Sequence, residues 1–267
     1  MRRPHSTSID QTLPPTTNWL AITSPDQIQE AYENGWRAGI LKTAFAGYDG
    51  KGQFVIRSDD QLEKAWLSMH GVEAILEGFV NFKRELSLIA VRGIDNSHKY
   101  YPLVENTHHN GILRLTTAPA ENISVKVQEQ AEHYMQTLLD EMEHVGVLTI
   151  ELFETSDGLV VNEMAPRVHN SGHWSIEGAR TSQFENHVRA ITGSPLGETA
   201  CLQQYCAMIN IIGEHGPVDK VLELGNAHLH LYGKSERKGR KLGHITITAN
   251  TLSELNKALN ALDAFMP

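Results

Sequence analysis

The chain has little of what marks several protein classes. Only two of its 267 residues are cysteines, Cys201 and Cys206, and their C-x4-C spacing has no second pair beside it, so neither a disulfide framework nor a zinc module is indicated. No apolar run approaches the ~20 residues that span a bilayer, and the polar start MRRPHSTSIDQTLPPTT lacks the apolar segment of a signal peptide. We therefore expect buried free thiols, no membrane partner and a cytoplasmic location.

Positive charge is also scarce. The 23 Lys and Arg residues against 32 Asp and Glu give a net charge of −9, which gives no general attraction for nucleic acid or an anionic membrane. An anionic substrate would need a local basic cluster. The candidate is the stretch 232–244, as a phosphate site or as a solvated turn; its basic residues are Lys234, Arg237, Lys238, Arg240 and Lys241.

Short alternating elements predict an α+β fold, in a chain long enough for one large domain or two modest ones. Ser24 with Pro25 marks one helix start, and Ser182 with Glu185 forms an expected capping box. Strands are predicted over 19–22, 38–45, 52–57, 73–80, 84–93, 99–109, 147–155, 158–166, 207–213, 227–233 and 243–249. Helices are predicted over 24–36, 58–71, 124–146, 182–193 and 252–265.

The stretch AGYDGKGQF, residues 46–54, has two interpretations. Asp-Gly between extended segments is typical of a hairpin tip that only reverses the chain. Glycines also let backbone N–H groups approach phosphate oxygens, and Lys42 on the preceding strand and Lys51 in the loop could reach the same phosphates. The stretch lacks the GK[ST] helix start of a Walker loop.

The segment ILEGFVNFKRE, residues 75–85, could connect two lobes. Its backbone groups would then bond an adenine edge, and Glu77 or Glu85 would accept ribose hydroxyls. Solvated carboxylates at strand ends are the alternative.

The stretch TIELFETSDGLVVNEM, residues 149–164, is predicted to be a hairpin. With Ser156-Asp157-Gly158 as its loop, Glu151 faces Glu163 at a cross-strand distance of ~5 Å. Two carboxylates that close repel each other unless a cation lies between them, and hard oxygen ligands favour Mg²⁺ or Mn²⁺, with Asn162 beside them. A register shifted by one residue would instead put the two carboxylates on opposite faces.

The stretch APRVHNSGHWS, residues 165–175, leaves this hairpin directly. Arg167 could clamp a small oxyanion in bidentate fashion, and His169 and Asn170 could donate hydrogen bonds or relay a proton. The alternative is a polar loop with capping histidines.

Together these stretches resemble a known family. GYDGKGQ, EGFVNFKRELS, YYPLVENTHHNGILR, NEMAPRVHNSGHWS and GRKLGHI are similar to motifs of the 5-(carboxyamino)imidazole ribonucleotide synthases, ATP-grasp enzymes of purine biosynthesis, from about Leu13 onward. The resemblance implies an ATP-grasp fold, with two α+β lobes holding the nucleotide between them and a β-rich C-terminal extension. It implies a lead-in over 1–12, a small lobe over 13–78, a large lobe over 79–200 and the extension over 201–267.

The resemblance also implies roles for particular residues. The metal, Mg²⁺ or Mn²⁺, would be bound by Glu151 and Glu163, and bicarbonate by Arg167, His169 and Asn170. Aminoimidazole ribonucleotide would contact Tyr48, Asp49, Lys234 and Arg240. ATP would contact Lys42, Gly47, Tyr48, Asp49, Gly50, Lys51, Gly52, Gln53, Glu77, Gly78, Phe79, Val80, Glu85, His108, Asn162 and Glu163.

The implied reaction is ATP-driven carboxylation of aminoimidazole ribonucleotide with bicarbonate through carboxyphosphate, by a chain that could form a homodimer. The family is expected to begin with a Rossmann-like domain, and no glycine-rich strand–helix turn precedes Trp19. Two alternatives therefore stay open: a remnant that binds Mg-ATP without carboxylating, and a different ATP-grasp carboxylase or ligase.

Overall fold

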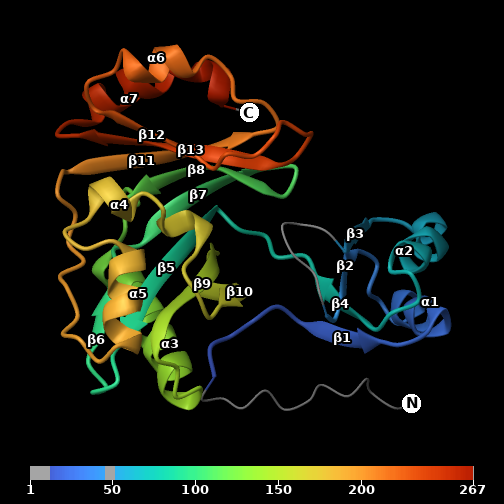
Figure 1. Cartoon of the computed structure of the whole chain (residues 1–267). Helices are drawn as coiled ribbons and strands as arrows, with labels where there is room; N and C mark the ends of the chain where they lie inside the picture. The colour runs from blue at the N-terminus through green and yellow to red at the C-terminus, as the bar shows by residue number, and fades with distance from the viewer. Residues whose placement is uncertain (1–12, 46–51, 267) are drawn as a thin grey trace. The chain divides into compact units, whose positions relative to one another are not determined.

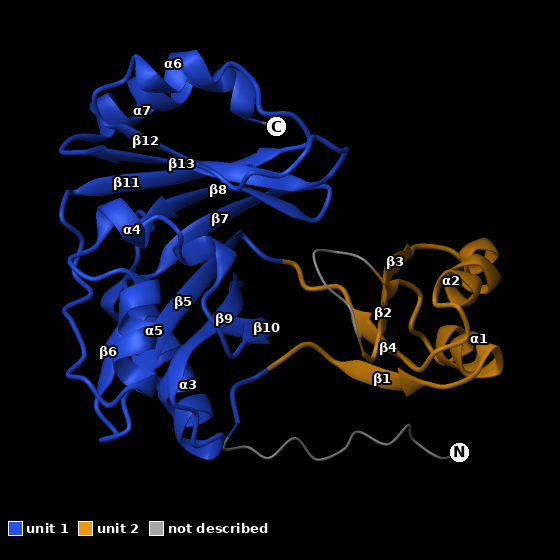
Figure 2. Ribbon diagram, in the orientation of Figure 1, with its two compact units in different colours: residues 1–15, 82–267 blue, residues 16–81 orange. Residues whose placement is uncertain are grey.

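The computed structural model describes residues 13–45 and 52–266, and these form two units (Figure 2). The small unit is residues 16–81, where the resemblance implied a small lobe over 13–78. The large unit is residues 82–267 together with the segment that ends at Pro15. Pro15 belongs there because its carbonyl accepts a 2.8 Å hydrogen bond from the Val161 N–H.

The small unit is an antiparallel sheet with helices on one face. Its strands follow the order β1-β4-β2-β3, with β1 Trp19–Ile22, β2 Gly39–Thr43, β3 Gln53–Ile56 and β4 Ala74–Gly78. Helix α1 (Pro25–Glu33) and helix α2 (Leu62–Ser68), which follows the short turn η1 (Asp59–Gln61), bury Leu41 and Leu76. Because side chains alternate along a strand, Lys42 and Glu77 lie on the opposite face.

The large unit is built on a nine-stranded antiparallel sheet (Figure 1). Its main path is β10-β9-β5-β7-β8-β11-β13-β12, and β6 pairs with β5. The bounds are β5 Arg84–Arg92, β6 His98–Tyr100, β7 Val104–His109, β8 Ile112–Ala118, β9 Gly146–Glu154, β10 Leu159–Ala165, β11 Tyr205–Ile212, β12 Ala227–Leu231 and β13 Lys241–Ala249. The β-rich C-terminal segment thus extends this sheet.

Helices bury the apolar side chains of this sheet in three clusters. Helix α3 (Val125–Glu141) covers Leu88 and its neighbours, while Ile89 points to the other face, toward Trp174 and helix α5 (Gln183–Ile191). Helices α6 (Val218–Leu222) and α7 (Leu252–Ala261) and the turn η3 (Asp263–Phe265) cover β11 and β13. The short α4 (Ser175–Gly178) and the turn η2 (Asn170–Gly172) follow β10.

The predicted elements are confirmed in outline, but strand β8 and the short helices α4 and α6 were not predicted. Two of the predicted features also need local correction. The strand expected over 99–109 is two strands, β6 and β7, and Pro102 lies between them without an N–H to donate. The expected capping box of α5 is half formed: Ser182 accepts from the Glu185 N–H at 3.1 Å, but the Glu185 carboxylate pairs with Arg189 at 2.6 Å.

Sequence analysis also predicted buried free thiols and no membrane-spanning segment. Both cysteines are free, Cys206 is buried and Cys201 is only partly so. No helix within residues 13–45 and 52–266 is long and apolar enough to cross a bilayer.

Candidate functional site

One face of the large sheet carries a row of polar side chains. The row follows from the register, since directly opposed residues on neighbouring strands share a face. From β10 to β12 its members are Glu163, Glu151, Ser87, Glu85, Asn106, Thr116, Asn210, His244 and His230. We call Glu85, His108, Glu151 and Glu163 the carboxylate end. We call His173, His230 and His244 the histidine end.

The two carboxylates of the predicted hairpin face each other, as expected. Glu163 on β10 is the cross-strand partner of Glu151 on β9. The turn, however, is longer than predicted, because Leu159 pairs with Glu154. In that register Glu151 would pair with Asn162. A β-bulge at Asn162 adds one residue to β10 and brings Glu163 opposite Glu151.

The surroundings of Glu151 oppose its negative charge. Burial raises its pKa, and the charges of Glu163 and Glu85 raise it further. The charge of His108 and a hydrogen bond from Asn162 act the other way without cancelling the effect. Carboxylates gathered so closely form a place where a cation would be stabilised.

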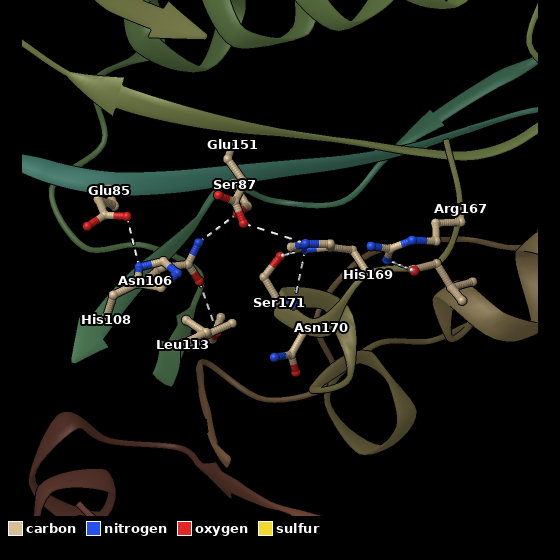
Figure 3. Close-up of polar contacts among 12 residues, drawn as sticks. Glu85, Ser87, Asn106, His108, Leu113, Glu151, Arg167, His169, Asn170 and Ser171 are labelled. Carbon is tan, nitrogen blue, oxygen red and sulfur yellow. Dashed lines mark hydrogen bonds and ion pairs between the residues drawn. The ribbon is translucent and has the colours of Figure 1, made fainter. Parts of the chain in front are cut away.

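His108 is held against Glu85 at this end. Its Nδ1 lies 2.8 Å from Glu85 Oε2, drawn as a dashed contact in Figure 3. Burial alone would lower the pKa of His108, but Glu85, Glu151 and Glu163 together raise it above the ordinary value. The imidazolium is therefore favoured and offsets part of the carboxylates' charge.

The loop after β10 places His169 beside the carboxylates. Gln183, fully buried, accepts from the His169 N–H at 2.9 Å and donates to its carbonyl at 2.6 Å. The Ser171 N–H donates to His169 Nδ1 at 3.3 Å, so the ring proton is on Nε2, 3.5 Å from Glu151 Oε1 (Figure 3). Burial, then Arg167 and Lys241, lowers the pKa of His169 to about 4, so the ring is a neutral donor.

The other predicted oxyanion residues lie on the same loop. The Asn170 side-chain oxygen accepts a hydrogen bond from the Lys241 ammonium on β13. Arg167 is exposed and its Nη1 donates to the Val168 carbonyl at 2.9 Å. Sequence analysis placed Lys241 in the basic stretch without assigning it a role, and it missed Gln183. No local signal connects either residue to this loop.

The histidine end is a cluster of three rings, of which two are stacked and the third lies edge-on. His244 lies parallel to His230, with centroids 4.3 Å apart, and edge-on to His173 at 5.1 Å. His173 donates from Nδ1 to the His169 carbonyl at 2.9 Å, and His230 Nε2 lies 2.7 Å from Glu177 Oε1. Burial, with added repulsion from Lys241, lowers the pKa of His173 to about 3. Burial and the neighbouring His173 lower the pKa of His244 to about 2.

The predicted ribonucleotide residues are only partly described. Lys234 Nζ lies 5.4 Å from the centroid of the Tyr232 ring, and Arg240 Nη1 donates to Ser235 Oγ at 3.0 Å. Both basic residues therefore follow β12, next to the histidine end. Tyr48 and Asp49, predicted for the same substrate, lie outside the described residues.

In the small unit, Lys42 pairs with Glu77 at 2.6 Å. The Gly78 N–H donates to the Asn18 carbonyl, and its own carbonyl accepts from Thr17. Glu77 and Gly78 end β4, and Phe79 and Val80, which were also expected at the adenine, follow this strand. The predicted hairpin is confirmed by the pairing of β2 with β3, and the Thr43 N–H donates to the Gly52 carbonyl at 2.9 Å. Of the predicted phosphate loop, Gly47 to Lys51 lie outside the described residues.

The carboxylate end suits a metal that is shared with a substrate. Within residues 13–45 and 52–266, no group of three or more His, Cys, Asp or Glu side chains could hold an ion by itself. Mg²⁺ is commonly bound by one or two carboxylates together with substrate phosphates and water. Two opposed carboxylates, one with a raised pKa, fit that requirement.

Comparison with known proteins gives consistent matches along the chain. Residues 7–184 match the ATP-grasp domain family, and residues 206–258 match the phosphoribosylaminoimidazole carboxylase C-terminal domain family. The N5-carboxyaminoimidazole ribonucleotide synthase of Pseudomonas aeruginosa is 44% identical over 252 residues, which are 94% of this chain and 69% of that protein.

Solved structures agree with these matches. The crystal structure of the synthetase from Thermus thermophilus matches with a TM-score of 0.87 and 45% identity over 94% of this chain and 68% of that one. The Aspergillus clavatus enzyme, in complex with ADP and 5-aminoimidazole ribonucleotide, matches with a TM-score of 0.84 and 31% identity over 93% and 68%. This chain spans about two thirds of the length of these relatives.

The ATP-grasp fold implied by the resemblance is thereby confirmed. The Pseudomonas aeruginosa and Thermus thermophilus enzymes each match over 94% of this chain, which takes in both the grasp lobes and the β-rich C-terminal segment. The chain belongs to the N5-carboxyaminoimidazole ribonucleotide synthases, a family of ATP-dependent ligases with the ATP-grasp fold.

Proposed function

We propose that this chain carboxylates 5-aminoimidazole ribonucleotide with ATP and bicarbonate, in the cytoplasm, as a step of purine biosynthesis. The observation that carries the proposal is the pairing of Glu151 with Glu163 beside the loop of His169. It puts a cation-attracting group of carboxylates next to neutral and positively charged donors on one sheet face. A reaction between a nucleotide phosphate and a small oxyanion requires that combination.

For the nucleotide, we assign residues in each unit. In the small unit these are Lys42, the loop that ends at Gln53, and segment 77–80; in the large unit they are Glu85, His108 and Asn162. Glu151 and Glu163 would hold Mg²⁺, which when bound neutralises developing charge on the phosphates. The ion pair between Lys42 and Glu77 holds the Lys42 side chain on the face away from the helices.

For bicarbonate, we assign Arg167, His169 and Asn170. Neutral His169 offers its Nε2–H to an oxyanion without contributing a second positive charge beside Arg167. Asn170 is already oriented by the Lys241 ammonium, so its amide NH₂ faces away from that contact as a donor. Bicarbonate is a poor electrophile, and phosphorylation to carboxyphosphate supplies a leaving group. Its carbonyl carbon then accepts the amine of the ribonucleotide.

For the ribonucleotide, we assign Lys234 and Arg240, with Tyr48 and Asp49. The two basic side chains suit its phosphomonoester. Assembly into a homodimer remains a prediction from the resemblance.

The test is release of ADP from Mg-ATP and bicarbonate, measured with and without aminoimidazole ribonucleotide. Ribonucleotide-dependent release, with carboxylated product in equal amount, is the expected result. The second candidate is a protein that binds Mg-ATP without carboxylating. Saturable ATP binding in calorimetry, without any ribonucleotide-dependent ADP, would favour that candidate and overturn the proposed reaction.

A further inference from the structure

Tyr232, the residue that follows β12, has two ammonium groups at its ring. Lys234 Nζ lies 5.4 Å from the ring centroid and Lys241 Nζ lies 5.5 Å from it. Both distances are within the range in which the ring quadrupole attracts a cation. Lys234 follows β12 and Lys241 begins β13, so the pairing of these strands puts both ammonium groups at one hairpin, where the Tyr232 N–H donates to the Leu242 carbonyl at 2.9 Å. The Tyr232 ring is the side chain that both of them contact there.

The ring itself is fixed from the other side. Its hydroxyl lies 2.6 Å from Nδ1 of His244. His244 is 1% exposed and its ring packs against His230 and His173, so packing holds the partner of the hydroxyl in place. Burial raises the pKa of Tyr232 to about 12, so the hydroxyl keeps its proton and remains a donor.

The two lysines are related to the sites proposed for two different substrates. Lys234 is assigned to the phosphate of the ribonucleotide, and Lys241 donates to Asn170 of the bicarbonate loop. Two positive charges at one neutral ring favour an anion beside them, and a phosphomonoester is the anion that the proposed substrate carries. Tyr232 therefore contacts both the lysine assigned to the ribonucleotide phosphate and the lysine that holds the bicarbonate loop.

We propose that Tyr232, oriented by His244, is a positioning residue that sets Lys234 and Lys241 for the ribonucleotide phosphate and for Asn170. This inference rests on the proposed function. It goes beyond the proposed function by assigning a role to the Tyr232 ring and to the buried His244. It follows that loss of the ring should weaken ribonucleotide binding and leave ATP binding intact.

Steady-state kinetics of two variants tests this role. Tyr232→Leu removes the ring, and we expect the KM for the ribonucleotide to rise about tenfold, the sum of two cation–π contacts, while the KM for ATP stays unchanged. Tyr232→Phe keeps the ring and loses only the hydrogen bond to His244, so the rise should be about threefold. The matched control is Tyr134→Leu on α3, whose hydroxyl accepts from Gln130 on the opposite face of the sheet.

A spectroscopic measurement separates this proposal from the proposed function. The lysines are reductively methylated with ¹³C, which keeps their charge, and Lys234→Arg and Lys241→Arg assign the two signals. We expect both to show ring-current shifts that persist in Tyr232→Phe and vanish in Tyr232→Leu. Unchanged signals in folded Tyr232→Leu, or an unchanged ribonucleotide KM, would overturn the role of Tyr232. If the wild-type chain showed no ribonucleotide-dependent turnover, the proposed function would be overturned. The ¹³C signals would still show whether the Tyr232 ring contacts both lysines, so the two failures can be distinguished.

Discussion

At the carboxylate end of the polar row, His108 lies against Glu85 and its pKa is raised. At the histidine end, His173 and His244 have pKa values of about 3 and about 2. Burial opposes the charged ring at both ends, so burial does not explain the contrast. The neighbours do: three carboxylates favour the imidazolium, whereas Lys241 and other histidines disfavour it.

This difference in charge suits the two ends of the sheet face to ligands of opposite charge. Acidic groups and a single favoured imidazolium make a place for a cation, and hence for a metal–nucleotide. The neutral rings of His173 and His244, near Lys234 and Lys241 at the Tyr232 ring, make a place for an anion without adding charge of their own. His169, with a pKa lowered to about 4, lies between the two regions. The reaction proposed here needs both regions, side by side.

The largest expected effect comes from breaking the carboxylate end. Glu163→Gln removes one charge of the opposed pair, and ATP turnover should fall by about 10²–10³-fold, the usual loss when one preorganised electrostatic group is removed. Turnover should recover in part at high Mg²⁺, because Glu151 remains. ADP release over a Mg²⁺ titration measures both. Glu129→Gln, an exposed change on α3, is the control; equal turnover in the two variants would disprove the metal assignment.

The next largest effect concerns Gln183, which holds His169 between the carboxylate end and the histidine end. Gln183→Leu leaves the N–H and carbonyl of His169 without their partner. Unfolding free energy should fall by about 2–4 kcal/mol, because two buried polar groups lose their hydrogen bonds. Urea unfolding measures the loss. The control is Gln29→Leu on α1, at an exposed position where the side chain donates to Glu33; an equal loss in the two variants would show that the contacts of Gln183 with His169 do not matter for stability.

A third effect is a loss of stability in acid. His169, His173 and His244 are neutral when folded and protonated below about pH 6.5 when unfolded. The unfolded state thus binds more protons in this window, and each ring should cost about 2 kcal/mol between pH 7 and pH 5. Urea unfolding at several pH values measures the slope.

The slope can be assigned with one variant. His244→Asn should flatten the decline between pH 7 and pH 5, whatever its effect on stability at neutral pH. His133→Asn, at an exposed position on α3, is the control. An unchanged slope in His244→Asn would mean that the histidine end titrates like exposed rings.

Local patterns predicted the elements well and the register only in part. Alternation and the Asp-Gly turn were enough for the hairpin of β9 and β10, and they put Glu151 opposite Glu163. The predicted loop was one residue too short, and the bulge at Asn162 compensated for the error. A bulge depends on how the edge strand pairs with its neighbour, so the sequence of residues 149–164 alone does not predict it.

Long-range contacts were beyond sequence analysis for a similar reason. Lys241 binds Asn170, 71 residues away, and Gln183 on helix α5 holds His169 in the loop after β10. His230 and His244 looked like alternating strand residues, and only their pairing across β12 and β13 reveals a stack. Chemistry that lies within one segment could be predicted; chemistry that the sheet assembles could not.

The smallest effect is the pH dependence of stability that His108 contributes, which has the opposite sign to that of His244. It therefore compares the two ends most directly. The folded pKa of His108 is raised, so its contribution to stability is complete below the unfolded pKa of about 6.5 and is lost as the pH rises through the folded value. His108→Asn should therefore cost about 1 kcal/mol at pH 6, the size of a partly exposed ion pair, and less at higher pH. Urea unfolding from pH 6 to pH 9 measures this. If His108→Asn and His244→Asn change the pH slope in the same direction, the two ends do not differ in charge, and the division of the row into a cation and an anion region fails.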